Sequence, residues 1–290
     1  MENKESKNFV LTNENYFSKE ANEIYMSVSS FKDFEECEVH ALAKLKGEYV
    51  EEKSKALLVG SYVDAYFSGE MEQFKAENPQ IFKKDGALLK DFEKADEIIK
   101  VIESDPLLMK YLGGKKQVVM TGVINGVKVK IKIDSLLDYA IVDQKIMASI
   151  RELVWKYDEE TKRNRQVDFV EAFGYDIQGA VYQEIARQNL GERLPFILAP
   201  TTKEEEPDKA LIQIDQEYLD KKLEYVKSKI QRYDMIKKGI VEPVGCGHCP
   251  SCRKARKLTD VVSYKELFNK VNEDEENSNW NIKRYKVSKG

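Results

Sequence analysis

The sequence predicts a layered α/β domain, and three features of the chain lead to this fold class. Residues from about 29 to 112 carry the apolar spacing of helices. A β-rich block follows, in which Asn125-Gly126 stands between two alternating runs. Helical segments then alternate with short strands up to about residue 238. At 290 residues with 42% apolar content, the chain can bury a substantial core.

The N-terminal half is expected to be helical. SSFKDFEECEVHALAKLKG predicts one helix capped by Ser29 or Ser30, and KALLVGSYVDAYFSG predicts a second. Between about 71 and 112 the pattern is that of amphipathic helix. Pro79 and Pro106 should interrupt it, because proline has no backbone N–H to donate.

The middle of the chain predicts strands. The two runs around Asn125-Gly126 form a hairpin, since this pair favours a two-residue turn. YAIVDQK predicts a third strand, and residues from about 168 to 190 a helix. PFILAPTT and KALIQID predict two more strands before a long helix over about 216–238.

The expected domain organisation is simple. Residues 1–24 form a flexible or loosely docked lead-in, and residues 25–270 form one domain that includes a cysteine-rich loop at 246–252. The acidic and polar stretch 271–290 is expected to be disordered.

The composition argues against several classes of protein. The chain has no apolar run long enough to span a membrane, and its polar start lacks the apolar stretch of a secretory signal, so we expect a cytoplasmic protein. No GxxxxGK[ST] phosphate loop occurs, which argues against an ATP-driven motor. The net charge of −4 is weak counter-evidence to nucleic-acid binding, because local basic faces form such a footprint.

Two carboxylates and a lysine suggest a metal-dependent site. Asp143 and Lys145 are two residues apart on a predicted strand and therefore share a face. Asp134 ends the preceding strand, so the two aspartates converge if the strands pair through the short LLDYA turn. They could then hold Mg²⁺ or Mn²⁺, with Lys145 beside the attacking water. The alternative is a turn residue and an exposed ion pair.

Other positions could support this site. Gln178 and Tyr182 lie one helical turn apart, as do Gly60 and Asp64, so Asp64 could be a third ligand. Each pair could also be ordinary helix packing. Lys128, Lys130 and Lys132 share the Asp134 face and could follow a phosphate backbone, or form a solvated sheet face.

The four cysteines indicate a second metal site. Cys246, Cys249 and Cys252 have the spacing C-x2-C-x2-C between turn residues, which is specific for metal. Cys37 is the only other cysteine, so one four-thiolate site would join the two ends of the domain. His248 lies within the loop and could replace a thiolate in a zinc site.

The ordered set Gly60 to Asp64, Asp134, Asp143 to Lys145, and Gln178 to Tyr182 resembles the RecB-type branch of the PD-(D/E)xK nucleases. Within that branch the chain resembles the phage and prophage exonuclease VIII (RecE-like) group over roughly residues 27–257. The resemblance implies a central mixed sheet flanked by helices and Mg²⁺-dependent digestion of DNA. It assigns Asp134 and Asp143 to the metal, Lys145 to the nucleophilic water, and Gln178 and Tyr182 to substrate or site support. The family usually has histidine where this chain has Asp64, which could still be a ligand.

The resemblance also bears on cofactors and partners. A cysteine near the N-terminus joined to a C-terminal triplet resembles the iron–sulfur site of some RecB-type nucleases, which implies a 4Fe–4S cluster at Cys37, Cys246, Cys249 and Cys252. Those proteins space the last cysteine further away, so Zn²⁺ is the alternative. The implied partners are duplex DNA ends and a phage single-strand annealing protein, and the implied assembly is a homo-oligomeric ring. The competing interpretations are an endonuclease for defence or DNA processing, and a catalytically silent DNA-binding module.

Overall fold

The chain, as a computed structural model, is described for residues 9–50, 54–158, 163–258 and 261. These residues fall into two compact units. The first comprises Met1–Val28 and Glu51–Gln231, and the second comprises Ser29–Val50 and Arg232–Gly290. The expected domain limits at 25–270 stay a prediction, and the expected tail at 271–290 lies outside the described residues.

A mixed five-stranded sheet organises the first unit, as the resemblance implied. Its order is β1-β2-β3-β6-β7, and β3 pairs with β6 in parallel while the other neighbours are antiparallel. The strands are β1 (Lys115–Ile124), β2 (Val127–Leu137), β3 (Ala140–Met147), β6 (Phe196–Thr202) and β7 (Ile212–Gln213). The predicted fold class is therefore confirmed.

The two turns between β1, β2 and β3 form where the sequence predicts them. Asn125 and Gly126 have φ angles of 47° and 79°, the left-handed values that a type I′ hairpin turn requires. In the next hairpin, Leu137 pairs with Ala140 and Ser135 with Val142. Extending this register by one residue brings Asp134 opposite Asp143 on one face of the sheet.

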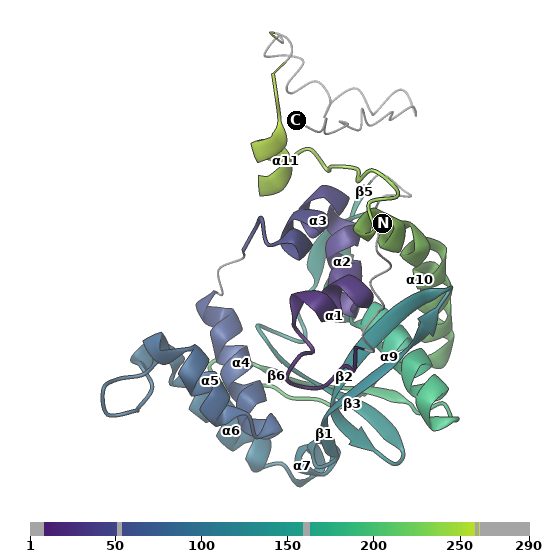
Figure 1. Cartoon of the computed structure of the whole chain (residues 1–290). Helices are drawn as coiled ribbons and strands as arrows, with labels where there is room; N and C mark the ends of the chain where they lie inside the picture. Colours follow the sequence, from purple (N-terminus) through teal and green to yellow (C-terminus); the bar gives the residue numbers. More distant parts are fainter. Residues whose placement is uncertain (1–8, 51–53, 159–162, 259–260, 262–290) are drawn as a thin grey trace. The chain divides into compact units, whose positions relative to one another are not determined.

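Helices cover both faces of this sheet. Side chains of α4, α6 and α7 pack in one core cluster with Val142 of β3 and Ile197 of β6. Helix α9 packs on the opposite face, where Gly179 approaches Phe196 so closely that a Cβ would lie 2.7 Å from the ring. Figure 1 shows α4, α5 and α6 grouped together, away from α9.

The helical elements of the first unit follow the expected order, with breaks at the two prolines. They are α1 (Lys19–Ile24), α4 (Lys55–Ser68), α5 (Met71–Glu77), the 3₁₀ turns η1 (Pro79–Ile81) and η2 (Lys90–Phe92), α6 (Lys94–Glu103), α7 (Pro106–Leu112), α8 (Phe169–Ala172), α9 (Tyr175–Leu190) and α10 (Gln216–Lys237), whose residues from Arg232 onward belong to the second unit.

The described part of the lead-in covers the β2 face that was expected to be solvated or to follow DNA. Lys130 is only 1% exposed, and its ammonium donates to Tyr16 O and, at 2.7 Å, to Asn22 Oδ1. Met26 forms a parallel bridge with Val129. Lys132 pairs with Glu70 at 3.5 Å. The proposed phosphate-following role of Lys130 is therefore wrong, because the N-terminal segment occupies that face.

A second, two-stranded sheet was not anticipated. Strands β4 (Val154–Asp158) and β5 (Arg163–Val167) pair antiparallel and belong to the first unit. Strand β5 is mostly polar, but in β4 the aromatic residues Trp155 and Tyr157 alternate with charged residues, which was an available strand signal.

The second unit contains α2 (Val28–Glu36), α3 (Glu38–Lys46), the end of α10 and α11 (Pro250–Ala255). One continuous helix was expected over α2 and α3. Cys37 instead adopts an extended conformation, with φ −166° and ψ 114°, and ends the first helix. Phe31 and Phe34 both pack against Tyr233, with ring centroids 5.3 Å apart in each pair.

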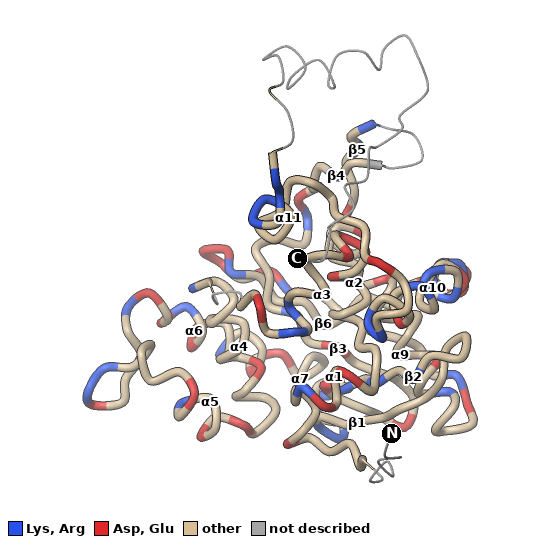
Figure 2. The backbone as a smooth tube through the Cα atoms, turned by 45° about the horizontal axis from the view of Figure 1, so that its top comes forward, with Lys and Arg blue, Asp and Glu red and all other residues tan. Residues whose placement is uncertain are grey.

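The surface charges are mixed in sign. Both Lys or Arg and Asp or Glu occur on α10 and on the helices around α6, as Figure 2 shows. None of the helices in the described ranges combines the length and apolar character needed to cross a membrane.

Candidate functional site

Asp143 contacts two other residues that the sequence singled out, Lys145 and Gln178. Its side chain is buried, with 1% of the residue exposed. One carboxylate oxygen, Oδ1, accepts a hydrogen bond of 2.6 Å from Gln178 Nε2. The other, Oδ2, lies 2.6 Å from Lys145 Nζ. The DxK pair on β3 and the first residue of the QxxxY pair on α9 therefore meet.

Asp134 lies on β2 beside this cluster. Its Oδ2 accepts the backbone N–H of Gln144 at 2.9 Å, which ties the carboxylate to β3. Burial raises the pKa of Asp134 well above its ordinary value, and the nearby charge of Asp143 raises it further. The two aspartates thus share one environment, as the strand register predicts.

Asp64 extends from α4 toward the same cluster. Burial raises the pKa of this carboxyl group, Lys145 acts in the opposite direction, and Asp143 raises it again. Gly60, one turn earlier, was interpreted as a site of close backbone approach. A Cβ there would meet Ile146 Cβ at 3.7 Å, an ordinary contact, so the packing does not require glycine.

Lys145 is enclosed by charge and by an aromatic ring. Burial lowers the pKa of its ammonium group, but Asp143 and Asp134 outweigh burial and raise it. The ammonium nitrogen lies 5.4 Å from the ring centroid of Tyr175, within cation–π range. Sequence reasoning missed Tyr175. The available signal was its spacing, because Tyr175, Gln178 and Tyr182 recur at helical intervals on α9.

Tyr182 lies next to the cluster without bonding to its carboxylates. Its hydroxyl donates to Lys132 O at 3.1 Å, and its ring packs edge-on against Phe196 with centroids 6.1 Å apart. Burial raises the pKa of Tyr182 well above its usual value. The structure therefore links α9 to the β2 backbone through Tyr182, and to Asp143 through Gln178.

Asp64, Asp134 and Asp143 are neighbours, but their carboxylate oxygens do not converge on one position. In the described part of the chain, the only set of three or more Cys, His, Asp or Glu with ligand atoms within 4.8 Å of one another is the cysteine group. Asp143 is turned toward Lys145 and Gln178, and Asp134 toward the backbone of Gln144.

Comparison with known proteins identifies the fold family. Residues 27–255 match the family described as a PDDEXK-like domain of unknown function (DUF3799). The chain belongs to this PDDEXK-like family. A solved structure from Eubacterium rectale, named a "putative exonuclease", is 49% identical, with a TM-score of 0.82 over 90% of this chain and 98% of that one. Curated proteins gave no match.

The PDDEXK-like chain carries a second cluster in its second unit. The sulfurs of Cys37, Cys246, Cys249 and Cys252 all lie within 4.8 Å of one another. Cys37 Sγ is 3.6 Å from Cys252 Sγ and 3.7 Å from Cys249 Sγ. The prediction that the first cysteine joins the C-terminal triplet is confirmed.

Backbone N–H groups surround these sulfurs. Cys246 N donates to Cys37 Sγ at 3.4 Å, Cys249 N to Cys246 Sγ at 3.3 Å, and Cys252 N to Cys249 Sγ at 3.4 Å. Burial raises the pKa of Cys249 and raises that of Cys252 to about 12. Burial also acts to raise the pKa of Cys246, but backbone N–H donors at His248 and Cys249 lower it to about 7. Such donors stabilise thiolates, the form of cysteine that binds metal.

The two histidines are not part of this group. His248 is exposed, and its Nδ1 lies 3.0 Å from Cys246 O. His40 Nδ1 lies 2.8 Å from Ser251 Oγ, which links α3 to α11. The structure therefore gives four thiols as the donor set, and His248 does not replace one of them.

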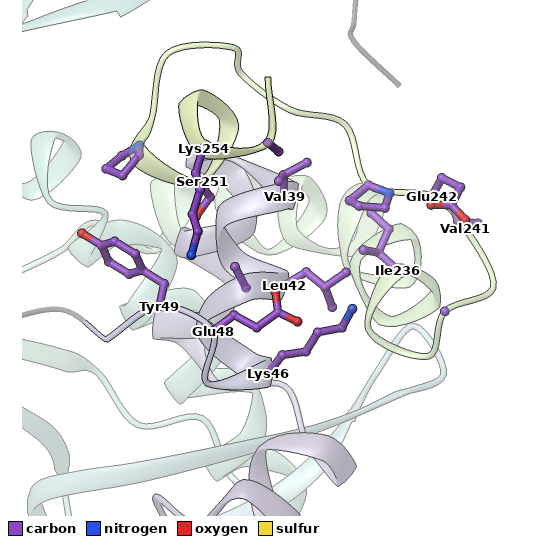
Figure 3. A pocket seen from close by; sticks show the side chains of 15 residues that line it. Val39, Leu42, Lys46, Glu48, Tyr49, Ile236, Val241, Glu242, Ser251 and Lys254 are labelled. Atoms are coloured by element: carbon purple, nitrogen blue, oxygen red, sulfur yellow. The ribbon is translucent and has the colours of Figure 1, made fainter. Parts of the chain in front are cut away.

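A pocket of about 590 Å³ adjoins the cysteine group. Figure 3 shows Val39 and Leu42 of α3, Ile236 of α10 and Lys254 of α11 around it. Its walls include two helices that each follow a cysteine of the group, since Cys37 precedes α3 and Cys249 precedes α11.

Proposed function

We propose that this protein is a metal-dependent DNA exonuclease that hydrolyses phosphodiester bonds from duplex ends. The observation that carries the proposal is the meeting of Asp143, Lys145 and Gln178 in one buried cluster. The name of the 49% identical Eubacterium rectale protein supports the same activity. The proposal includes Mg²⁺ or Mn²⁺ as the ion, and a supply of single strands to a phage-type annealing protein. It also includes a cytoplasmic location, because the four clustered thiols suit a reducing compartment.

The donor set of the cluster fits a hard divalent cation. Mg²⁺ and Mn²⁺ prefer carboxylate oxygens, and Asp64, Asp134 and Asp143 supply them from three different elements. The raised pKa values of Asp64 and Asp134 mean that their negative charges are poorly stabilised by the protein itself. A bound cation would supply that stabilisation. When bound, it would also polarise the scissile phosphate and lower the pKa of the attacking water.

The residues of the chain divide the remaining work. Asp134 and Asp143, with Asp64 beside them, would hold the ion. The ammonium of Lys145 would donate hydrogen bonds to the attacking water and the phosphate. Gln178 fixes the orientation of the Asp143 carboxylate through Oδ1, and Tyr182 holds the β2 backbone next to Asp134.

The test is digestion of end-labelled linear duplex DNA and of covalently closed circles with Mg²⁺. We expect the wild type to digest linear DNA and leave circles intact, and Asp143→Asn to digest neither. Asp138→Asn is the matched control, because Asp138 is exposed in the turn between β2 and β3. Cleavage of circles would favour the endonuclease. DNA binding without any cleavage would favour the silent binding module.

For the cysteine group we propose one tetrahedral Zn²⁺ ion, the alternative that the resemblance left open. Zn²⁺ binds four thiolates at about 2.3 Å, so sulfurs at tetrahedral corners lie about 3.8 Å apart. In a cubane cluster each thiolate binds a different iron, which separates the sulfurs to roughly 6 Å. The Cys37 separations of 3.6 and 3.7 Å, and the overall limit of 4.8 Å, support the single ion.

The metal itself can be measured in protein purified without oxygen. We expect about one zinc per chain, no brown colour, and the absorption of a tetrahedral thiolate site after replacement with Co²⁺. His248→Ala should keep the metal, since His248 lies outside the donor set. About four irons per chain with visible absorption would instead establish the 4Fe–4S cluster.

A further inference from the structure

The two-stranded ribbon of β4 and β5 presents aromatic rings to solvent. Trp155 is 67% exposed and Tyr157 is 46% exposed. They are two residues apart on β4, so both point from the same face of the ribbon. Neither ring makes a hydrogen bond or a ring contact with another residue in the described ranges.

The rest of that face consists of amides. In the ribbon register, Trp155 pairs with Gln166 and Tyr157 with Asn164. A surface that buries against protein usually has an apolar centre, whereas rings alternating with amides suit a ligand with flat faces and polar edges. Nucleobases have this chemistry. The two residues are about 7 Å apart along the strand, the rise of roughly two base steps in B-form DNA.

The opposite face of the ribbon is anchored. Arg165 forms a two-point ion pair with Glu171 of α8, one contact at 2.9 Å, and Lys156 Nζ donates to Glu171 O at 3.2 Å. Val167 at the base of β5 is buried. A two-stranded ribbon is marginally stable alone, so these contacts hold the aromatic face in a fixed direction. Figure 2 shows basic residues on β5.

Helix α8, to which the ribbon is bound, connects it to the carboxylate cluster. In the chain, the ribbon stands between β3, which carries Asp143 and Lys145, and α9, which carries Gln178. In space, Phe169 of α8 contacts the ring of Tyr175, with centroids 6.2 Å apart. The Tyr175 ring in turn lies beside Lys145 Nζ. A strand held on the ribbon would therefore be held by the same elements as the cluster.

We infer that Trp155 and Tyr157 form a stacking platform for the bases of single-stranded DNA, an inference that rests on the proposed nuclease function. Each ring stacks on a base without reading its identity, because every base offers a π face. The ribbon thus binds one strand through an element that contacts the carboxylate cluster by way of α8 and Tyr175.

Trp155 can report this stacking directly. The chain has two tryptophans, and Trp280 lies outside the described residues. In the full chain carrying Trp280→Phe and Asp143→Asn, a single-stranded oligonucleotide of about 16 nucleotides should quench the Trp155 fluorescence. An abasic strand of equal length should not, because it offers the same phosphates without bases. Equal quenching by both strands, or by neither, would overturn the platform.

Substitutions give a second measurement. Trp155→Ala and Tyr157→Ala should each weaken single-strand binding ~10-fold. Tyr139→Ala is the matched control, because Tyr139 is 46% exposed in the β2–β3 turn and outside the ribbon. Unchanged single-strand binding in both ribbon variants would also overturn the inference. So would Trp155 fluorescence that changes with protein concentration in the absence of DNA, because this would indicate that a second copy of the chain covers this face. If the oligonucleotide quenches Trp155 but the wild type cleaves no DNA, only the nuclease function is rejected. If the wild type cleaves DNA but the oligonucleotide does not quench Trp155, only the stacking platform is rejected.

Discussion

Gln178 of α9 and Asp143 of β3, which are 35 residues apart in the chain, meet through a hydrogen bond of 2.6 Å from Nε2 to Oδ1. This bond fixes one carboxylate oxygen and leaves the other beside Lys145. The orientation of Asp143 therefore depends on α9 as well as on its own strand.

Replacing Gln178 tests this dependence. Gln178→Ala should lower the cleavage rate about 10- to 100-fold, the range typical for residues that orient a metal ligand. Gln178→Glu should cost more, because it places a second negative charge against a buried carboxylate. Steady-state digestion at several Mg²⁺ concentrations measures both. Gln188→Ala is the control, since Gln188 lies on the same helix and bonds to Val123 of β1. Wild-type rates for Gln178→Ala at every Mg²⁺ concentration would remove Gln178 from the site.

Asp134→Asn should abolish cleavage and yet stabilise the metal-free protein at neutral pH. The folded pKa of Asp134 is raised above the ordinary 3.8, so the folded state holds the proton more tightly than the unfolded state. The contribution of protonated Asp134 to the free energy of unfolding is fully present below about pH 4 and is lost as the pH rises through the folded pKa. Asparagine at this position does not ionise, so the variant does not lose this stability as the pH rises.

Thermal unfolding in EDTA measures the effect. The Tm of Asp134→Asn should exceed that of the wild type at pH 8, by a margin that shrinks toward pH 4. Mg²⁺ should raise the Tm of the wild type only, because a ligand stabilises the state that binds it. A lower Tm for the variant at pH 8 would contradict the buried-charge argument.

Asp64→His introduces the residue that is usual at this position in the RecB-type nucleases that the sequence resembles. We expect retained or raised activity with a preference shifted toward Mn²⁺, because imidazole nitrogen suits Mn²⁺ better than Mg²⁺. The change also removes one negative charge near Asp143. Digestion rates with each ion measure this preference. If Asp64→Ala matches the wild type with both ions, Asp64 is not a ligand.

Cys37→Ser and Cys249→Ser should destabilise the second unit equally, although these residues are 212 positions apart. Each removes one ligand of the same centre, and metal affinity is part of the folding free energy, on the order of 5 kcal/mol or more. The double variant should cost little more than either single one. Denaturant unfolding with and without a chelator measures this, and the chelator should affect only the wild type and His248→Ala. Additive losses in the double variant would show that the two cysteines do not share a centre.

The sequence alone determined the features that depend on neighbouring residues. Asn125-Gly126 specifies its turn because these residues tolerate left-handed φ angles at low cost. Alternation along β3 places Asp143 and Lys145 on one face wherever that strand lies. The short turn after β2 then fixes Asp134 opposite Asp143. The order of these motifs was sufficient to indicate the PDDEXK-like family.

Only the tertiary structure decided what depends on distant residues. Lys130 appears solvated in a local pattern, but the segment around Tyr16, more than a hundred residues earlier, buries it. The helix expected through Cys37 breaks there, and Cys37 then meets the C-terminal thiols. The spacing C-x2-C-x2-C suits a cluster or a single ion, and our proposal of a single ion rests on sulfurs that lie 3.6 and 3.7 Å apart. Local patterns determine backbone dihedral angles and which side chains share a face. The distances between residues far apart in the sequence are determined by tertiary packing, which the local sequence of either segment does not specify.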